Sequence, residues 1–256
     1  MKAILLCAGY ATRLHPLTKD TPKHLLEVGG KPILEHVLEK VEQISAVDAI
    51  HIITNDRFFY SFLEWAKEYA AKDPSAKKIV VINDNTDSNE NRLGALGDIQ
   101  FAIKQKHIKD DLLLIAADNI FEFSLKDMHA AFEDNGKTTI ALYDVKEKKL
   151  ARQYGVVEVD DSNKLVHFVE KPKEPKSTLI STGIYMIPKK DLPLFRVYIA
   201  QGNCADKIGS FFEWLHTKED VFCYTTEEPW YDIGTLDQLE EAREYFAKKQ
   251  DADVLI

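Results

Sequence analysis

Apolar runs of strand length alternate with helix-patterned segments through the first half of the chain. The expected strand and helix pairs are 3–8 with 33–44, 49–54 with 58–70, 79–83 with 93–104, and 112–117 with 125–132. This alternation is typical of a parallel sheet, and continuous apolar strands suit a sheet that helices cover on both faces. Because ligands bind beyond the carboxyl ends of such strands, we expect Gly9, the segment after Asn83, and Asp118 to surround one crevice.

From about position 138 onward the pattern changes to shorter strands. We expect strands at 139–144, 155–159, 165–170, 179–187 and 221–225, a hairpin turn at 160–163, and helices at 192–200, 207–216 and 236–249. The predicted fold class is α/β, with a mostly parallel central sheet flanked by helices and an inserted smaller β-rich part. With no long linker and no repeat, we expect a single domain, 1–256, made of a first half (1–137), a second half (138–235), and a terminal helix and tail (236–256).

Composition excludes several classes of protein. A chain of 256 residues with 45% hydrophobic content can fill a large core, and its net charge of −9 argues against broad nucleic-acid binding. No apolar run reaches the length of a membrane span, and the start of the chain lacks a secretory pattern, so we expect a cytoplasmic protein without a membrane or nucleic-acid partner. Cys7, Cys204 and Cys223 are widely spaced, and we expect all three to be buried thiols.

The first 23 residues combine an apolar strand, a bend of small residues and two spaced cations. Gly9 and Ala11 allow a sharp turn that directs backbone N–H groups toward an anion. Arg13 can bind two phosphate oxygens at once, whereas Lys23 acts as a compact point charge. The pattern therefore indicates a polyphosphate site, and it is equally compatible with an ordinary strand–loop connection carrying two solvated cations.

Two aspartates lie next to apolar or aromatic segments, where an unpaired carboxylate is unfavourable. Asp118 directly follows the most apolar strand, where it can bind a metal ion or cap the strand end as a turn residue. Mg²⁺ suits such a carboxylate, because this ion takes few protein ligands and completes its shell with water and phosphate oxygens. Asp232 lies between aromatic residues and a glycine turn, and its alternative role is to support the N-terminus of the helix that follows.

The second half carries three short motifs suited to a hydroxyl-rich ligand. Glu170-Lys171-Pro172 ends a predicted strand, so Lys171 is held at a rim. Tyr154-Gly155 and Thr182-Gly183 place small or aromatic polar groups on strands, where a glycine allows close approach of a ligand or marks only a bulge.

Together the motifs identify a family. They are Gly9 to Leu14, Pro16-Leu17-Thr18, Pro22-Lys23, Leu25-Leu26, Val28, Gly30-Lys31-Pro32, Asp118, Tyr154 to Glu158, Glu170-Lys171-Pro172, Ser181 to Tyr185 and Trp230 to Thr235. In this order, over nearly the whole chain, they resemble the sugar-1-phosphate nucleotidylyltransferases, most closely the glucose-1-phosphate thymidylyltransferase-like group. The resemblance implies a Rossmann-like nucleotidyltransferase fold, in which the first half mainly binds a nucleotide and the second half mainly binds a sugar.

The resemblance also implies roles for individual residues. The catalytic residues would be Arg13, Lys23 and Lys171, and Mg²⁺ would be held by Asp118 and Asp232. The residues that contact the nucleotide would be Ala8, Gly9, Tyr10, Ala11, Thr12, Arg13, Lys23, Asn89, Gly94 and Asp118. Those that contact the sugar phosphate would be Tyr154, Gly155, Glu170, Lys171, Thr182 and Gly183. The implied partners are a nucleoside triphosphate and a sugar 1-phosphate, by default glucose 1-phosphate with dTTP or UTP, and a homo-oligomer is left open.

This chain departs from the family pattern at two places. Ala11 stands where the family loop usually has a second glycine, and the segment 84–92 lacks the usual glutamine-containing sequence, which leaves the base open. Because the chain ends soon after its terminal helix, we expect no fused acyltransferase β-helix.

The implied reaction is attack by a sugar-phosphate oxygen on the α-phosphorus of the triphosphate, which needs cations rather than a general base or a covalent nucleophile. Two alternatives remain: a phosphocholine-type cytidylyltransferase, for which Trp230 and Tyr231 offer aromatic surface, and a catalytically silent regulatory module.

Overall fold

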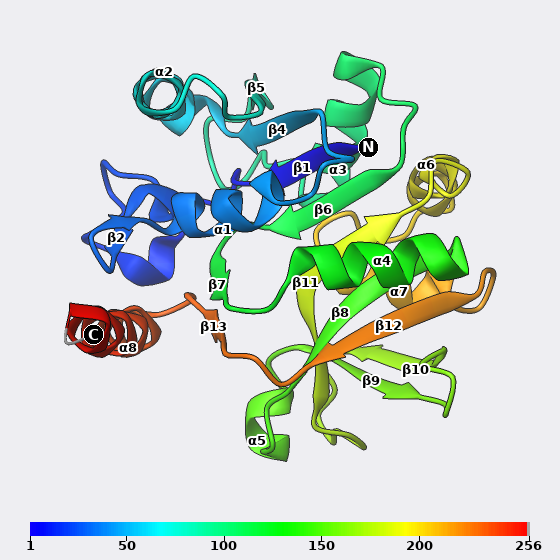
Figure 1. Cartoon of the computed structure of the whole chain (residues 1–256). Coiled ribbons are helices and arrows are strands. Elements are labelled where there is room, and N and C mark those ends of the chain that lie inside the picture. Colours follow the sequence, from blue (N-terminus) through cyan, green and yellow to red (C-terminus); the bar gives the residue numbers. More distant parts are fainter. Residues whose placement is uncertain (255–256) are drawn as a thin grey trace.

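A large mixed sheet forms the centre of the molecule in the computed structural model, which describes residues 1–254 (Figure 1). Its strand order is β10-β9-β11-β6-β1-β4-β5, and β8 pairs with β11 and β12 beside this path. The parallel part consists of β1 (Lys2–Leu6), β4 (Ala49–Thr54), β5 (Lys78–Asn83) and β6 (Leu112–Ala116). The carboxyl ends of these strands therefore share one edge, as the alternating pattern predicted.

Helices cover both faces of the parallel part. The helices of the described chain are α1 (Ile33–Glu42), α2 (Phe59–Lys72), α3 (Ala95–Lys106), α4 (Leu125–Asn135), the short α5 (Lys148–Ala151), α6 (Leu192–Ala200), α7 (Ile208–Leu215) and α8 (Leu236–Val254). Of these, α5 and α8 pack outside the parallel part. Along β1, Ala3 and Leu5 pack into one hydrophobic cluster with α1, α2 and α4, whereas Ile4 packs into another with α3, α6 and α7. Alternate side chains of a strand point to opposite faces, so both faces of β1 are buried.

The second half extends the same sheet mostly with antiparallel pairs. β8 (Thr138–Asp144) and β9 (Gly155–Val159) pair with the long strand β11 (Leu179–Ile187), β10 (Leu165–Glu170) pairs with β9, and β12 (Val221–Thr226) runs parallel to β8. β11 runs antiparallel to β6 at one end and to β8 along its length, with a register shift between Ser181 and Tyr185. The inserted β-rich part is thus continuous with the parallel first half through the β6–β11 pairing.

A small two-stranded sheet brings distant acids together. β7 (Asn119–Phe121) and β13 (Trp230–Asp232) pair antiparallel, and Asp232 lies opposite Asn119. The backbone N–H of Ile233 also donates to the carbonyl of Asp118 at 3.1 Å. Hydrophobic patterning did not predict either strand, because three residues are too few to show a period.

The remaining elements are short. A hairpin joins β2 (Glu27–Val28) to β3 (Lys31–Pro32), and single 3₁₀ turns lie at Thr12–Leu14, Lys23–Leu25 and Asp56–Phe58. Every strand and helix expected from the sequence is present within a few residues of its predicted bounds. The last two positions of the expected tail, 255 and 256, lie outside the described residues.

One expectation about the cysteines is wrong. Cys7 and Cys223 are buried in strand regions, whereas Cys204 is exposed in the loop between α6 and α7. The apolar residues around Cys204 belong to the flanking helices, and the loop itself carries the thiol to the surface. Among the residues that the structure describes, no helix combines the length and apolar character needed to cross a membrane.

Candidate functional site

The loop after β1 makes a tight left-handed bend at Ala11, whose φ is +47°. The hydroxyl of Thr18 donates to the carbonyl of Ala11 at 2.8 Å, and the backbone N–H of Leu14 donates to the same carbonyl at 3.0 Å. Asn55 holds the start of the loop by donating from Nδ2 to the carbonyl of Ala8 at 2.9 Å. The bend is therefore built with alanine, in a conformation that is less favourable for a residue with a Cβ than for glycine.

A cavity of about 550 Å³ lies over this loop at the carboxyl end of the parallel strands, and we call it the loop cavity. It is lined by every residue that the resemblance assigned to the nucleotide: Ala8, Gly9, Tyr10, Ala11, Thr12, Arg13, Lys23, Asn89, Gly94 and Asp118. The strand-end rule thus placed the crevice correctly.

Lys23 is buried and paired with Asp118. Its Nζ donates to Oδ2 of Asp118 at 2.8 Å and to the carbonyl of Ile233 at 3.0 Å. The alternative of a solvated lysine is therefore wrong, because the Lys23 residue is only 7% exposed. Burial acts to raise the pKa of Asp118, but the charge of Lys23 and its hydrogen bond outweigh burial and lower that pKa, so the carboxylate is ionised.

Asp232 lies beside Asp118, and its pKa is shifted in the opposite direction. Burial first, and then the negative charge of Asp118, raise the pKa of Asp232, while the hydroxyl of Tyr154 donates to its Oδ2 at 3.2 Å. Asp232 does not support the terminal helix. The first turn of α8 is capped instead by Thr235, whose Oγ1 accepts from the backbone N–H of Gln238 at 3.3 Å.

The two aspartates have the donor chemistry of a divalent-cation site. Both line the same cavity, and each carboxylate makes ionisation of its neighbour less favourable unless a cation lies between them. Within residues 1–249, no group of three or more histidine, cysteine or acidic side chains is placed to hold a metal ion. A two-carboxylate set fits Mg²⁺, which commonly completes its shell with water and substrate phosphate.

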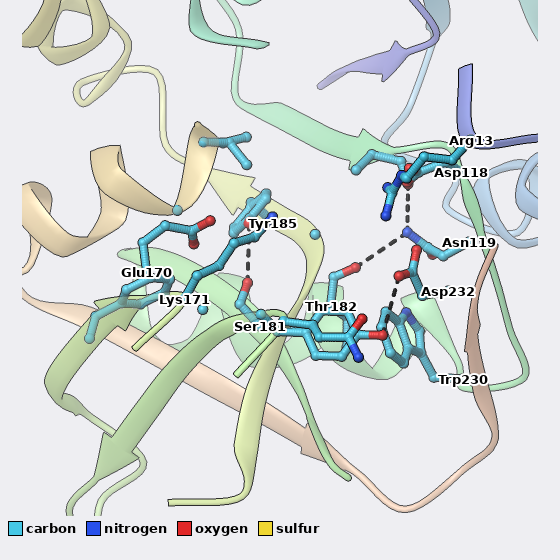
Figure 2. A pocket seen from close by; sticks show the side chains of 18 residues that line it. Arg13, Asp118, Asn119, Glu170, Lys171, Ser181, Thr182, Tyr185, Trp230 and Asp232 are labelled. Atoms are coloured by element: carbon cyan, nitrogen blue, oxygen red, sulfur yellow. Dashed lines mark hydrogen bonds between the residues drawn. The ribbon is translucent and has the colours of Figure 1, made fainter. Parts of the chain in front are cut away.

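A second cavity, of about 430 Å³, lies between β11, the end of β10 and the start of α7; we call it the sheet cavity. It is lined by all residues that the resemblance assigned to the sugar phosphate: Tyr154, Gly155, Glu170, Lys171, Thr182 and Gly183. Figure 2 shows Glu170, Lys171 and Tyr185 on one side of this cavity and Arg13, Asp118, Asn119 and Asp232 on the other.

Glu170 and Lys171 form the side of the sheet cavity away from the aspartates. A Cβ at Gly209 would lie 1.9 Å from Oε2 of Glu170, so only glycine at this start of α7 leaves space for the carboxylate. Burial raises the pKa of Glu170, and the charges of Lys171 and Lys207 oppose the rise. Lys171 has a φ of +52° and is held by its backbone N–H, which donates to the carbonyl of Tyr154 at 3.0 Å.

The two cavities adjoin. Both are lined by Arg13, Ala116, Asp118 and Ile208, so the end of β6 forms part of the wall of each. A ligand in the loop cavity and a ligand in the sheet cavity therefore come closest to each other beside Asp118 and Arg13.

Sequence reasoning missed several lining residues. Those of the sheet cavity are Ala116, Asn119, Gln153, Phe168, Ile208 and Gly209, and those of the loop cavity include Arg92, Asp98 and Asp206. Ser181, Tyr185 and Trp230 belong to the motifs, but the sequence assigned them no contact with the sugar phosphate. For Asp98 the sequence did offer a signal, because this acid lies among apolar residues in the first turn of α3. Asp206 has no local signal, because its place depends on a bidentate pair in which Nε and Nη2 of Arg92 donate to its carboxylate at 2.9 and 3.0 Å.

Comparison with known proteins shows the family. The model of the nucleotidyl transferase family matches residues 2–249, and the chain belongs to this family. The chain is 31% identical over 254 residues to the bifunctional protein GlmU of Methanocaldococcus jannaschii, a match that covers 99% of this chain and 56% of the relative. It is 29% identical over 187 residues to the UTP–glucose-1-phosphate uridylyltransferase AglF of Haloferax volcanii, covering 72% of this chain and 71% of the relative.

The chain thus spans about half the length of the GlmU relatives that it matches. Solved structures share its fold. A UDP-glucose pyrophosphorylase complexed with UDP-glucose has a TM-score of 0.81 at 20% identity and covers 97% of this chain and 98% of its own. A putative glucose-1-phosphate thymidylyltransferase from Bacillus anthracis has a TM-score of 0.81 at 24% identity and covers 96% of this chain and 95% of its own.

Proposed function

We propose that this protein transfers a nucleotidyl group from a nucleoside triphosphate to a sugar 1-phosphate, with glucose 1-phosphate and dTTP or UTP as the default pair. The observation that carries the proposal is the meeting of the two cavities at Asp118 and Arg13. The triphosphate occupies the loop cavity and the sugar phosphate occupies the sheet cavity. Residues 1–137 therefore mainly hold the nucleotide and 138–235 mainly the sugar, within one domain. The names of the relatives support these two substrate classes.

The main obstacle to this reaction is the electrostatic repulsion between the two phosphate groups. A phosphate oxygen of the sugar phosphate is already an anion, so it needs no general base, but it must approach another phosphate. Two like unit charges 4 Å apart repel by about 4 kcal/mol at an effective dielectric of 20. Cations must therefore line the approach, and Arg13 and Lys171 lie on opposite sides of the sheet cavity in Figure 2.

Each cation has its own task in the proposal. Lys171 binds the phosphate of the sugar and directs its oxygen toward the α-phosphorus. Arg13 and Lys23, which line the loop cavity, stabilise the charge that accumulates on the departing pyrophosphate. The P–O bond to the β-phosphate breaks as the new P–O bond forms, and the products are a nucleotide-sugar and pyrophosphate.

We further propose that Asp118 and Asp232 hold Mg²⁺. The bound ion would polarise phosphoryl oxygens and neutralise part of their charge. Lys23 holds Oδ2 of Asp118 by a 2.8 Å hydrogen bond, which orients the carboxylate. Tyr154 orients Asp232 in the same way from the side of the sheet cavity.

The sugar is held in the proposal by groups that accept or donate hydrogen bonds at its hydroxyls. Glu170 supplies a carboxylate that occupies the space left beside Gly209. Tyr185 supplies a ring that stacks on Phe212 at 4.0 Å between centroids, so its face cannot tilt freely. A rigid ring and an oriented carboxylate select the stereochemistry of a hydroxyl-rich ligand.

The experiment is a pyrophosphate-release assay with UTP, dTTP, CTP, ATP and GTP, each combined with a set of sugar 1-phosphates and with phosphocholine, in the presence of Mg²⁺. The proposal expects release with at least one sugar 1-phosphate and none with phosphocholine. Release only with phosphocholine would support the cytidylyltransferase alternative. Tight nucleotide binding without release from any pair would support the silent module, and either result would overturn the proposal.

A further inference from the structure

Two buried carboxyl groups lie side by side behind the loop cavity. Asp84 follows the end of β5, Asp98 lies in the first turn of α3, and these residues are 4% and 6% exposed. Their side chains lie within hydrogen-bonding reach of each other. Oδ2 of Asp84 and Oδ1 of Asp98 meet no N–H or hydroxyl donor among the described residues. Burial and mutual repulsion make two adjacent negative charges unfavourable, so these two carboxyl groups hold one proton between them.

The contacts of Asp84 show which of the two carboxyl groups carries this proton. Oδ1 of Asp84 accepts from the backbone N–H of Thr86 at 2.7 Å and from its hydroxyl at 2.8 Å, as an ionised carboxylate would. Oδ1 of Asp98 meets no such donor within the described part of the chain. Asp98 also faces the negative charges of Asp84 and Asp206. Burial, followed by the charge of Asp84, raises the pKa of Asp98 to about 8. Asp98 is therefore the protonated partner, and it donates to Asp84.

Asp98 also faces the loop cavity, which it lines together with Asn89 and Gly94. Gly94 has a φ of +77°, and a Cβ there would lie 2.7 Å from Cα of Asp206, so the backbone is packed tightly at this point. Arg13 and Lys23 mark the place of the phosphates in the same cavity. The same cavity extends to Gly94 and Asp98 at the start of α3, which leaves that end of it for the base of a nucleotide whose phosphates lie on those cations.

We propose that Asp98, as a neutral carboxylic acid, accepts a hydrogen bond from a ring N–H of the bound base and so favours uracil, thymine and guanine over cytosine and adenine. Uracil and thymine carry this donor at N3 and guanine carries it at N1, whereas cytosine N3 and adenine N1 are acceptors. A neutral acid presents one donor, taken here by Asp84, and one free acceptor, as a side-chain amide does. The inference rests on the proposed function for the identity of the ligand.

The test measures dissociation constants by calorimetry for UTP, dTTP, GTP, CTP and ATP with Mg²⁺ and no sugar phosphate. The wild-type protein is expected to bind the first three at least about tenfold more tightly than the last two, the value of one hydrogen bond. Asp98→Ala is expected to weaken binding of UTP about tenfold and to remove the preference among bases. Asp98→Asn keeps a donor for Asp84 and an acceptor for the base, so its affinities are expected within about threefold of the wild type.

A matched control shows whether a change in base preference comes from the position of Asp98 or from the removal of any buried acid. Asp191 is 3% exposed, accepts a hydrogen bond at 2.8 Å from Thr138, and does not line the loop cavity. Asp191→Asn is expected to leave the base preference unchanged. A thermal melt of each variant confirms folding, and Asp98→Asn remains informative if Asp98→Ala does not fold.

Three results would overturn the inference. They are an unchanged base preference in folded Asp98→Ala, a loss in Asp98→Asn as large as that in Asp98→Ala, or tighter binding of CTP or ATP by the wild type. The relative affinities are independent of turnover. If the protein discriminates between bases as expected but releases no pyrophosphate with any acceptor, the proposed function fails while the inference about base recognition stands.

Discussion

The Nζ of Lys23 lies 2.8 Å from Oδ2 of Asp118, and the same ammonium group donates to the carbonyl of Ile233 at 3.0 Å. One cation thus joins the segment after the first loop, the turn after β6 and the end of β13. Because Asp232 directly precedes Ile233, this contact helps to set the distance between the two aspartates.

Replacement of Asp118 by asparagine is expected to abolish Mg²⁺-dependent pyrophosphate release, with a loss of at least about 10³-fold in kcat, because it removes the ionised ligand at the meeting of the cavities. The fold should persist, since Lys23 keeps its bond to the carbonyl of Ile233. Steady-state kinetics and a thermal melt check both statements. Asp48→Asn, at an exposed acid paired with Lys2, is the control. Near-normal turnover of Asp118→Asn would remove Asp118 from the mechanism.

Replacement of Lys171 by alanine is expected to raise the KM for the sugar 1-phosphate and to lower kcat, together by about 10²-fold in kcat/KM, while the affinity for the triphosphate stays within about threefold. The physical reason is that Lys171 lines only the sheet cavity. Kinetics at varied sugar phosphate and calorimetry with triphosphate alone measure the two effects. The exposed Lys173, two positions further on, is a matched control as Lys173→Ala. An equal loss of affinity for both substrates would contradict the assignment.

Replacement of Ala11 by glycine is expected to stabilise the protein by about 0.5 kcal/mol. The strain that glycine removes from the left-handed bend outweighs the stability lost because glycine raises the conformational entropy of the unfolded chain. Ala11 has a φ of +47°. Urea unfolding measures the change. Ala130→Gly, at an exposed position of the α4 helix, is the control and should destabilise by about 1 kcal/mol. Destabilisation of Ala11→Gly by a similar amount would show that the bend carries no such strain.

Stability is expected to depend on pH through Asp98. Burial, followed by the charge of Asp84, raises the pKa of Asp98 to about 8, above its value of about 3.9 in an unfolded chain. The folded state therefore retains the proton, and this stabilisation is complete below about pH 4 and is lost as the pH rises through about 8. The nearby charges are those of Asp84 and Asp206.

Asp98→Asn cannot ionise, so it should be more stable than the wild type at about pH 9, by about 1–3 kcal/mol, with a smaller difference at about pH 5. Urea unfolding at both values measures this gap. A gap that is constant with pH would show that Asp98 does not titrate in this range.

The sequence predicted the helices and strands of the parallel half well, because β1, β4 and β6 are apolar, largely buried runs and each helix shows an apolar stripe. It also predicted part of the lining of both cavities, since motifs with glycines and charges follow the strand ends directly. It did not predict the β7–β13 pairing that places Asp232 beside Asp118, because that pairing joins segments more than 100 residues apart through three residues each. Asp206 and Gly209 were missed for the same reason, since only the packing of the α6–α7 loop against Gly94 and Glu170 gives them a role.

The most direct test of the central claim is a crystal structure of the protein with its nucleotide-sugar product and Mg²⁺. The account predicts the nucleoside in the loop cavity, the sugar in the sheet cavity, and the bridging phosphates beside Asp118 and Arg13. A product bound with its two parts exchanged between the cavities, or bound away from Asp118, would contradict it.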